Sequence, residues 1–143
     1  MQKPNSYIVF KCKDTLFAFD IAFVYKPALL QSIHSLPHID NGRIAGISNI
    51  GGEIVVVANL PKILGLSTGE ICTQSPKMSI VCIFDKLKVA FLVDDIFGVV
   101  NAECEPYDDE NAMFECAAFD YFGSKCLVLD AELLETAIER RYL

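Results

Sequence analysis

The stretch that decides the fold reads Ile44-Ala45-Gly46-Ile47-Ser48-Asn49-Ile50-Gly51-Gly52-Glu53-Ile54-Val55-Val56-Val57-Ala58-Asn59. Aliphatic and β-branched residues dominate both sides of a glycine pair, which is the composition of paired β-strands. Two-residue hairpin turns require positive φ angles, and glycine adopts these angles without steric cost. We therefore predict two antiparallel strands over residues 44–50 and 53–59, joined by a tight turn at Gly51 and Gly52.

Short apolar segments of the same kind continue on either side of this hairpin. We predict strands at residues 7–11, 15–21, 78–84, 88–93, 96–100, 116–121 and 125–129, and an acidic loop at 103–111. A bend or bulge is expected at Gly98, because glycine inside a strand marks such irregularities. Residues 21–30 are compatible with a strand, a short helix or both, since Pro27 interrupts either pattern.

Two segments have helical signals. Residues 60–65 carry Pro61 near their start and Gly65 at their end, which is the usual placement of both residues in a helix. Residues 130–141 begin with Asp130 as a cap and place apolar residues on one face, namely Leu133, Leu134, Ala137 and Ile138. We predict a short helical turn and a short C-terminal helix.

Many short strands separated by glycine and proline turns indicate a mostly β fold of the barrel or sandwich type. The polar segment 67–77 contains Gly69 and Pro76 and is interpreted as a linker. We expect residues 1–143 to form a single domain with two lobes, at about 1–72 and 76–143.

The charge of the chain argues against several classes of partner. The 143 residues carry a formal charge of −7, and no basic run exceeds Arg140-Arg141. Nucleic-acid binding needs clustered basic side chains, so nucleic acid is not expected as a partner. The apolar runs are far shorter than the ~20 residues that cross a bilayer, and the first residues do not resemble a signal peptide. We predict no direct membrane insertion and a cytoplasmic location.

The sequence offers no clear constellation for catalysis, cofactor binding or metal binding. His34 and His38 have a spacing that suits a metal on a helix, but Pro37 breaks that helix. Residues 94–95 and 108–110 offer paired carboxylates, and the second set is interpreted as solvated surface because it lies in a polar loop. No glycine-rich phosphate loop is present, and Gly51-Gly52 is read as a turn. We predict no enzyme activity, no cofactor and no metal.

Six cysteines lie at positions 12, 72, 82, 104, 116 and 126, with no C-x-x-C pair. Several of them fall in apolar strand segments, so the simplest interpretation is reduced and mostly buried thiols. A small enzyme with a cysteine nucleophile stays an alternative, because counting residues cannot exclude it.

Four segments, in order, resemble the CheW-like family. The family pattern Asn-Leu-Arg-Gly-Glu-Ile-Leu-Pro-Val-Val-Asp-Leu corresponds to residues 49–60 here, and the "LLGL" turn corresponds to residues 63–66. Residues 91–100 are similar to "LLVDEVLGVV" and residues 127–134 to "LLLDLDKLL". The chain departs from the family at Gly51 in place of arginine, Val56 in place of proline and Asn59 in place of aspartate.

The resemblance implies two five-stranded SH3-like β-barrels packed around a shared hydrophobic core, with a short C-terminal helix. It implies a non-catalytic scaffold or adaptor of bacterial chemotaxis, whose protein partners are the regulatory domain of the histidine kinase CheA and the cytoplasmic tips of chemoreceptors. The alternative is a CheW-like module of another pathway, such as pilus or gliding control, or an inhibitory competitor. Loss of the family arginine at Gly51 suits such a divergent member.

The resemblance also suggests where partners bind. The candidate partner-binding residues are Asn49, Gly51, Gly52, Glu53, Ile54 and Asp94. Each has a structural alternative: Asn49 and the glycines would only shape the hairpin, Ile54 would belong to the core, and Asp94 would brace a turn. For Asp94 we favour the bracing role.

Overall fold

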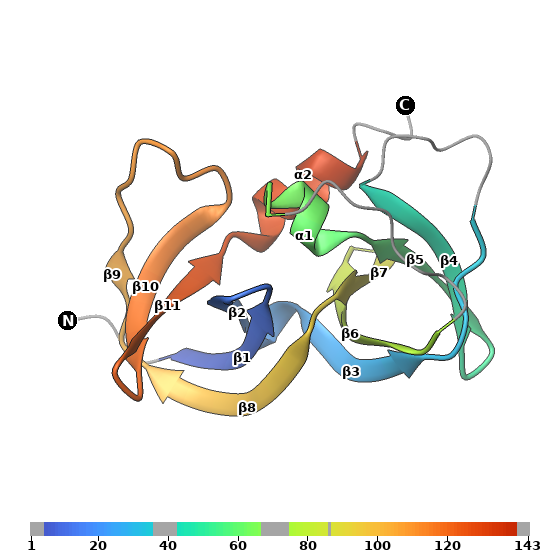
Figure 1. Ribbon diagram of the computed structural model, residues 1–143, viewed down its shortest axis with the longest axis horizontal. Coiled ribbons are helices and arrows are strands. Elements are labelled where there is room, and N and C mark those ends of the chain that lie inside the picture. Colours follow the sequence, from blue (N-terminus) through green and yellow to red (C-terminus); the bar gives the residue numbers. More distant parts are fainter. Residues whose placement is uncertain (1–4, 36–42, 67–74, 86, 140–143) are drawn as a thin grey trace.

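The computed structural model describes residues 5–35, 43–66, 75–85 and 87–139, which form two strongly curved sheets side by side (Figure 1). The first sheet has the strand order β8 (Asp95–Ala102), β1 (Asn5–Cys12), β2 (Thr15–Asp20), β11 (Ser124–Leu129), β10 (Glu115–Tyr121) and β9 (Glu105–Pro106). The second has the order β3 (Val24–Leu30), β6 (Lys77–Phe84), β7 (Leu87–Leu92), β5 (Glu53–Ala58) and β4 (Ile44–Ile50). The helices α1 (Leu60–Ile63) and α2 (Ala131–Glu139) lie over the junction between the sheets.

This arrangement confirms the prediction of a mostly β fold with a short C-terminal helix. In the described part of the chain the second sheet has five strands, as expected, whereas the first has six. The additional strand is β9, which lies within the acidic segment predicted as a loop and pairs Pro106 with Ala117 of β10. Each sheet curls around its own interior cluster, and we refer to the two sheets as the first and second barrels.

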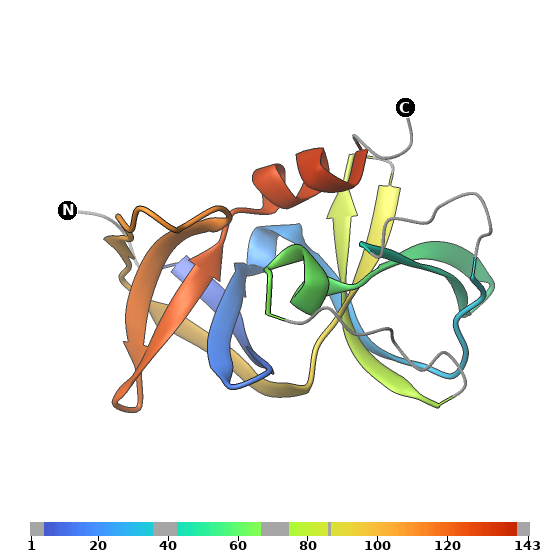
Figure 2. The same cartoon turned by 45° about the horizontal axis from the view of Figure 1, so that its top comes forward.

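The two barrels do not coincide with the expected lobes at 1–72 and 76–143. Strands β1 and β2 belong to the first barrel together with β8 to β11, and β6 and β7 complete the second barrel. The reason is a pair of parallel pairings between distant segments, with Leu16 opposite Cys126 and Val56 opposite Val89. Figures 1 and 2 show β3 leaving the first barrel for the second and β8 returning. Residues 67–74 of the expected linker lie outside the described residues.

Strands β1 and β6 are buried on both faces over much of their length, because they border two different cores. Along β1, Ile8 and Phe10 point to a core shared by both barrels, while Val9 points into the first barrel. Along β6, Ile80 enters the shared core and Val81 enters the second barrel. The fully buried aromatic residues of the shared core are Phe10, Phe17, Phe19 and Phe91. This double burial accounts for the continuous apolar runs in the sequence.

The region 21–30, for which both helix and strand stayed open, contains both. A single 3₁₀ turn, η1 (Ile21–Phe23), is capped by Asp20, whose Oδ1 accepts a hydrogen bond of 3.0 Å from the Ala22 backbone nitrogen. Strand β3 follows and includes Pro27, opposite Ile80. A proline is tolerated there because β3 is the last strand in the sheet order and needs partners on one side only.

The predicted glycine turn, the bulge at Gly98 and the cap at Asp130 are confirmed. The hairpin between β4 and β5 has φ angles of 59° at Gly51 and 91° at Gly52, as a two-residue turn requires. The register of β1 against β8 shifts next to Gly98, which places the expected bulge. Asp130 caps α2 through Oδ1, which accepts from the Glu132 nitrogen at 3.0 Å. On α2, however, Leu133 is 46% exposed and does not join the buried face.

Asn59, which stands where the family has aspartate, begins helix α1. Its Oδ1 accepts a hydrogen bond of 3.3 Å from the Lys62 nitrogen, and its own backbone nitrogen donates to the Arg43 carbonyl at 2.7 Å. A cap needs an acceptor oxygen rather than a negative charge. The amide therefore retains the capping role of the carboxylate, and this departure preserves the fold.

Gly46 permits a close approach between two backbone segments in the second barrel. The backbone of His34, just after β3, bridges Ile47 of β4 through hydrogen bonds of 2.8 and 2.9 Å. A Cβ atom at position 46 would lie 2.2 Å from the His34 carbonyl oxygen, and the φ angle there is 152°. Only glycine allows the two ends of this sheet to meet in this way.

We expect the Gly46→Ala variant to lose about 2–4 kcal/mol of unfolding free energy, because overpacking and backbone strain act together. Urea denaturation followed by circular dichroism measures the loss. Gly98→Ala is the matched control, since Gly98 also has a positive φ of 128° but no atom within 4 Å of its Cβ position. Equal losses in both variants would show that contact with His34 is unimportant.

Candidate functional site

The hairpin between β4 and β5 holds five of the six predicted site residues. The Asn49 Oδ1 accepts a hydrogen bond of 2.8 Å from the Gly52 nitrogen, so this side chain helps to fix the turn. No atom lies within 4 Å of a Cβ position at Gly51 or Gly52. The glycines are therefore required for their backbone angles and not for lack of space.

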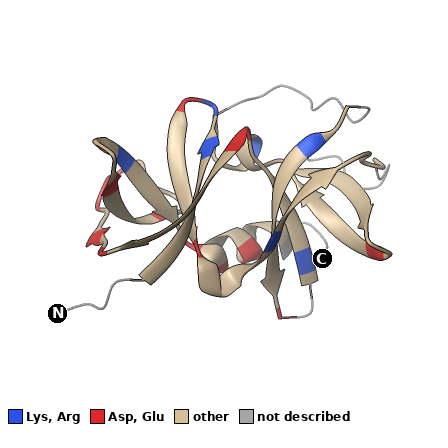
Figure 3. Cartoon of the chain, turned by 90° about the horizontal axis from the view of Figure 1, so that it is seen from below, with Lys and Arg blue, Asp and Glu red and all other residues tan. Residues whose placement is uncertain are grey.

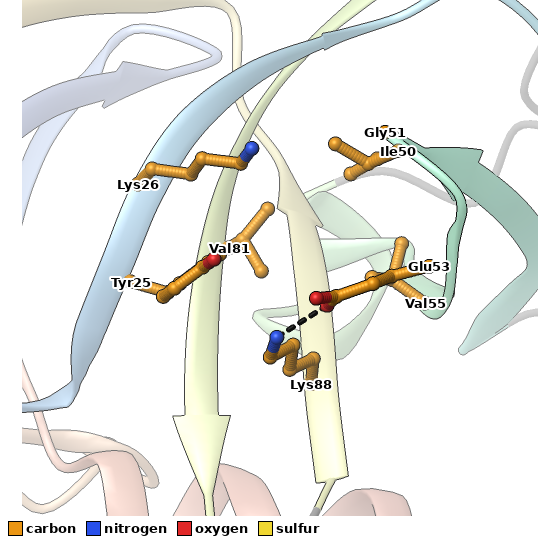
Figure 4. Close-up of a pocket in the computed structure, with 8 residues that line it drawn as sticks. All are labelled: Tyr25, Lys26, Ile50, Gly51, Glu53, Val55, Val81 and Lys88. Carbon is orange, nitrogen blue, oxygen red and sulfur yellow. Dashed lines mark hydrogen bonds and ion pairs between the residues drawn. The ribbon is translucent and has the colours of Figure 1, made fainter.

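Next to this hairpin the open end of the second barrel forms a small hollow of about 110 Å³ (Figure 4). We call it the barrel mouth, and it is lined by Tyr25, Lys26, Ile50, Gly51, Glu53, Val55, Val81 and Lys88. Val55 and Val81 are buried members of the barrel interior. The remaining residues surround these two valines, so the hollow is the solvent-facing end of the apolar interior.

Three charged residues of the barrel mouth occupy inward-facing positions of their strands. Side chains alternate along a strand, so residues two apart share a face. Lys26, Glu53 and Lys88 each stand two residues from a member of the interior, respectively Ala28, Val55 and Ala90. The inward faces thus change from apolar to charged at the barrel end, where water becomes accessible.

The charges of the barrel mouth interact with one another and with an aromatic ring. Lys88 Nζ forms an ion pair with Glu53 Oε2 and lies 4.3 Å from the centre of the Tyr25 ring. Lys26 Nζ lies 5.5 Å from the same ring centre. The hydrogen bond from Lys88 lowers the pKa of Glu53, and the bond to Glu53 raises the pKa of Lys88. With two lysines and one glutamate, the mouth is locally positive on an acidic chain.

The predicted site residues lie in two different regions of the structure and have different roles. Gly51 and Glu53 line the barrel mouth. Ile54 is 63% exposed, so the alternative that placed it in the core is wrong. Asp94 belongs to a different region: its carboxylate accepts a hydrogen bond from the Lys13 backbone nitrogen, and its own nitrogen donates to the Lys11 carbonyl at 2.9 Å. Asp94 therefore braces the turn between β1 and β2.

Sequence reasoning missed Tyr25, Lys26, Val81 and Lys88 as neighbours of the hairpin. An inward-facing lysine interrupting an apolar alternation is a usable signal, and Lys88 before Val89-Ala90 carries it. For Lys26 the signal is hidden, because Pro27 obscures the strand and the register of β3 shifts between Val24 and Lys26. The contact between β3, β5 and β7 also depends on tertiary folding.

Burial makes four thiols, Cys12, Cys82, Cys116 and Cys126, poor nucleophiles. Burial raises the pKa of Cys12, Cys82 and Cys126 to about 12, and burial also raises the pKa of Cys116. A thiol with such a pKa stays protonated near neutral pH. Cys72 lies outside the described residues. The prediction of reduced, buried cysteines is confirmed for the three that are fully enclosed.

Within the described ranges no three His, Cys, Asp or Glu side chains gather as a metal site. His38 of the predicted histidine pair is not among these residues. Neither described helix has the length and apolar character needed to cross a bilayer. Figure 3 shows acidic and basic positions interspersed over both barrels.

Comparison with known proteins shows the family to which this fold belongs. A model of the CheW-like domain matches residues 6–137. The chain belongs to the CheW-like family. It is 31% identical over 123 residues to the "Chemotaxis protein CheW" of Thermotoga maritima, covering 86% of this chain and 75% of that protein. The scaffolding protein TtCheW of Thermoanaerobacter tengcongensis superposes with a TM-score of 0.73 at 21% identity, covering 88% of each chain.

The CheW-like family is a family of chemotaxis scaffolds, and one position of its sequence pattern lines the barrel mouth. The family arginine would stand at Gly51, on the edge of the hollow. In this chain the position has no side chain, and the charges near it come from Lys26, Glu53 and Lys88 instead. The fold of the family is thus retained, and position 51 carries no charged side chain at the hollow.

The Lys88→Gln variant is expected to raise the pKa of Glu53 towards the ordinary glutamate value, because the hydrogen bond from Lys88 is the largest cause of its lowering. Lys26→Gln should give a smaller rise, since Lys26 acts only through Coulomb attraction. A carbon-13 NMR titration of the Glu53 carboxyl measures both. The lowered pKa means that the ion pair stabilises the fold above the unfolded pKa, and this contribution is lost as pH falls through the folded pKa.

Lys13→Gln serves as the control for this titration, because Lys13 lies in the turn between β1 and β2 of the first barrel. It should leave the pKa of Glu53 unchanged. An unchanged pKa of Glu53 in Lys88→Gln would contradict the ion pair.

We expect Asp94→Ala to lower the unfolding free energy by about 1–2 kcal/mol, because the Lys13 nitrogen loses its charged acceptor. Lys13 has a φ of 57°, an uncommon backbone conformation, so the turn cannot easily rearrange to give the Lys13 nitrogen another acceptor. Asp94→Asn keeps an acceptor oxygen and should lose less. Urea unfolding curves of both variants measure the unfolding free energy. If Asp94→Asn lost as much of it as Asp94→Ala, the bracing role would be refuted.

Proposed function

We propose that this chain is a non-catalytic cytoplasmic adaptor that couples the cytoplasmic tips of chemoreceptors to the regulatory domain of the histidine kinase CheA. The observation that carries the proposal is the match to the CheW-like domain over residues 6–137. Similarity to a protein named "Chemotaxis protein CheW" supports the same pathway. The partners follow from the family and not from any complex of this chain.

The architecture supports an adaptor because it supplies a rigid body with separate surfaces. Coupling two proteins requires that each meets its own surface and that the two surfaces keep a fixed relation. Here the chain crosses between the barrels before β3 and again before β8. Both barrels also pack against one shared core. Independent movement of the barrels would expose that core, so the two surfaces are held together.

The hairpin between β4 and β5 is the surface that we assign to one partner. Ile54 offers an exposed apolar side chain, and Asn49 stands directly opposite it on β4 and supplies a polar group. An apolar centre with a polar rim is the usual anatomy of a protein interface. Gly51 and Gly52 set the shape of the tip. Asp94 contributes indirectly, by bracing the turn of the first barrel.

The absence of enzyme activity is part of the proposal. Burial keeps the pKa of Cys12, Cys82 and Cys126 at about 12, which removes three candidates for a cysteine nucleophile. The named relatives are a chemotaxis protein and a scaffolding protein. A scaffold role accounts for the conserved architecture without any reacting group.

Binding of the purified CheA regulatory domain and of a receptor cytoplasmic tip, measured by isothermal titration calorimetry, tests this function. We expect Ile54→Glu to weaken the affinity for one of these partners by about tenfold or more, because a charge is placed at the apolar centre of the interface. Met113→Glu is the matched control, since Met113 is 69% exposed but lies away from the hairpin, just before β10.

The outcomes separate the possible pathways. No binding of the kinase domain at micromolar concentration would refute the coupling role. Binding of the kinase without the receptor would replace it by an inhibitory competitor. Binding of neither, with a folded protein, would move the chain to another pathway such as pilus or gliding control. Equal effects of Ile54→Glu and Met113→Glu would remove the hairpin from the interface.

A further inference from the structure

The barrel mouth has the composition of a site for a single carboxylate. It places two ammonium groups, Lys26 and Lys88, around a small hollow whose base is the buried pair Val55 and Val81. Figure 4 shows Lys26 reaching across the hollow towards Ile50, and Glu53 facing Lys88 on the other side.

The two lysines are not equivalent. Lys88 is engaged by Glu53, and each shifts the pKa of the other in the direction that favours its charged form. Lys26 lies over the Tyr25 ring at 5.5 Å and attracts Glu53 only through Coulomb interaction. Of the two lysines, Lys26 would therefore be stabilised more by a hydrogen bond to an additional anion.

The size and charge of the hollow limit what can occupy it. A hollow of about 110 Å³ has room for a small polar group such as the carboxylate end of an acidic side chain. Glu53 on the opposite wall would repel a doubly charged phosphate. No atom lies within 4 Å of a Cβ position at Gly51, so an incoming group can pass beside the hairpin tip.

We propose that the barrel mouth receives an aspartate or glutamate side chain of a protein partner, whose carboxylate pairs with Lys26 while Lys88 keeps Glu53. This inference rests on the proposed function in one respect, since the hairpin beside the mouth is the assigned partner surface. The net charge of −7 repels acidic partners from most of the molecule. The locally positive mouth therefore fixes where and in which orientation an acidic side chain docks.

The carboxylate preference can be tested without any natural partner. The probes are two capped tripeptides, Ala-Glu-Ala and Ala-Gln-Ala, titrated at millimolar concentration and followed by NMR. We expect the glutamate peptide to shift the Gly51 amide and the Lys26 side-chain signals, and the glutamine peptide to leave them unchanged. Equal responses to both peptides would overturn the proposal, whatever the kinase domain does.

The protein source of the carboxylate is tested with the CheA regulatory domain and the receptor tip. Lys26→Gln should weaken one of the two complexes by about fivefold and Lys26→Glu by at least about tenfold, with a reduced dependence on salt. Lys13→Gln removes one lysine from the first barrel and should change neither affinity by more than about twofold. Circular dichroism verifies that each variant is folded.

These outcomes are distinguishable from failure of the proposed function. If the wild-type chain binds neither protein, the coupling role fails, while the peptide titration still decides the carboxylate site. If the wild type binds but Lys26→Glu changes neither affinity, the coupling role stands and the assignment of a partner side chain to the barrel mouth is overturned.

Discussion

The shared core between the two barrels is the constraint on which the rest of the structure depends. Phe10 and Phe19 from the first barrel meet Phe91 from the second, with ring centres 5.0 and 5.3 Å apart for the pairs Phe10–Phe19 and Phe19–Phe91. Leu134 and Ile138 of α2 cover the same cluster. Neither barrel can bury these side chains alone, because each occupies its own interior with other residues. Folding of one barrel therefore supports folding of the other.

That constraint also explains the rigidity that an adaptor needs. Strands such as β1, β6 and β7 contribute alternate residues to two cores, so a shift of one residue in register would disrupt both. The parallel pairings of β2 with β11 and of β5 with β7 join segments from opposite halves of the chain. Surfaces that lie on different barrels are thus connected through packed side chains and not through a hinge.

At the barrel mouth the same alternation of side chains has a different consequence. At the end of the barrel, inward-facing side chains are no longer surrounded by the apolar interior. The inward-facing positions there are occupied by charged residues. Lys26, Glu53 and Lys88 meet there because β3, β5 and β7 end together around one opening. With glycine in place of the family arginine at Gly51, that opening stays accessible. Charged residues at this opening leave the packing of the interior intact, because they lie beyond its buried side chains.

The amino-acid sequence by itself determined the local structure of this protein and its family. The glycine pair at Gly51-Gly52, the caps Asn59 and Asp130, and the bulge at Gly98 are local features, since each follows from the conformational preferences of a few neighbouring residues. The ordered motifs indicated the CheW-like family because they span nearly the whole chain, and the match over residues 6–137 bears this out.

Only the tertiary structure decided which strands share a barrel and which charges share a site. The expected lobes followed the chain order, whereas parallel pairing of β2 with β11 and of β5 with β7 mixes the two halves. Such pairing joins residues far apart in sequence, where no local preference can specify the partner. The approach of Lys26 to Glu53 and Lys88 depends on the bulge in β3 and on closure of the barrel, both of which are set by packing.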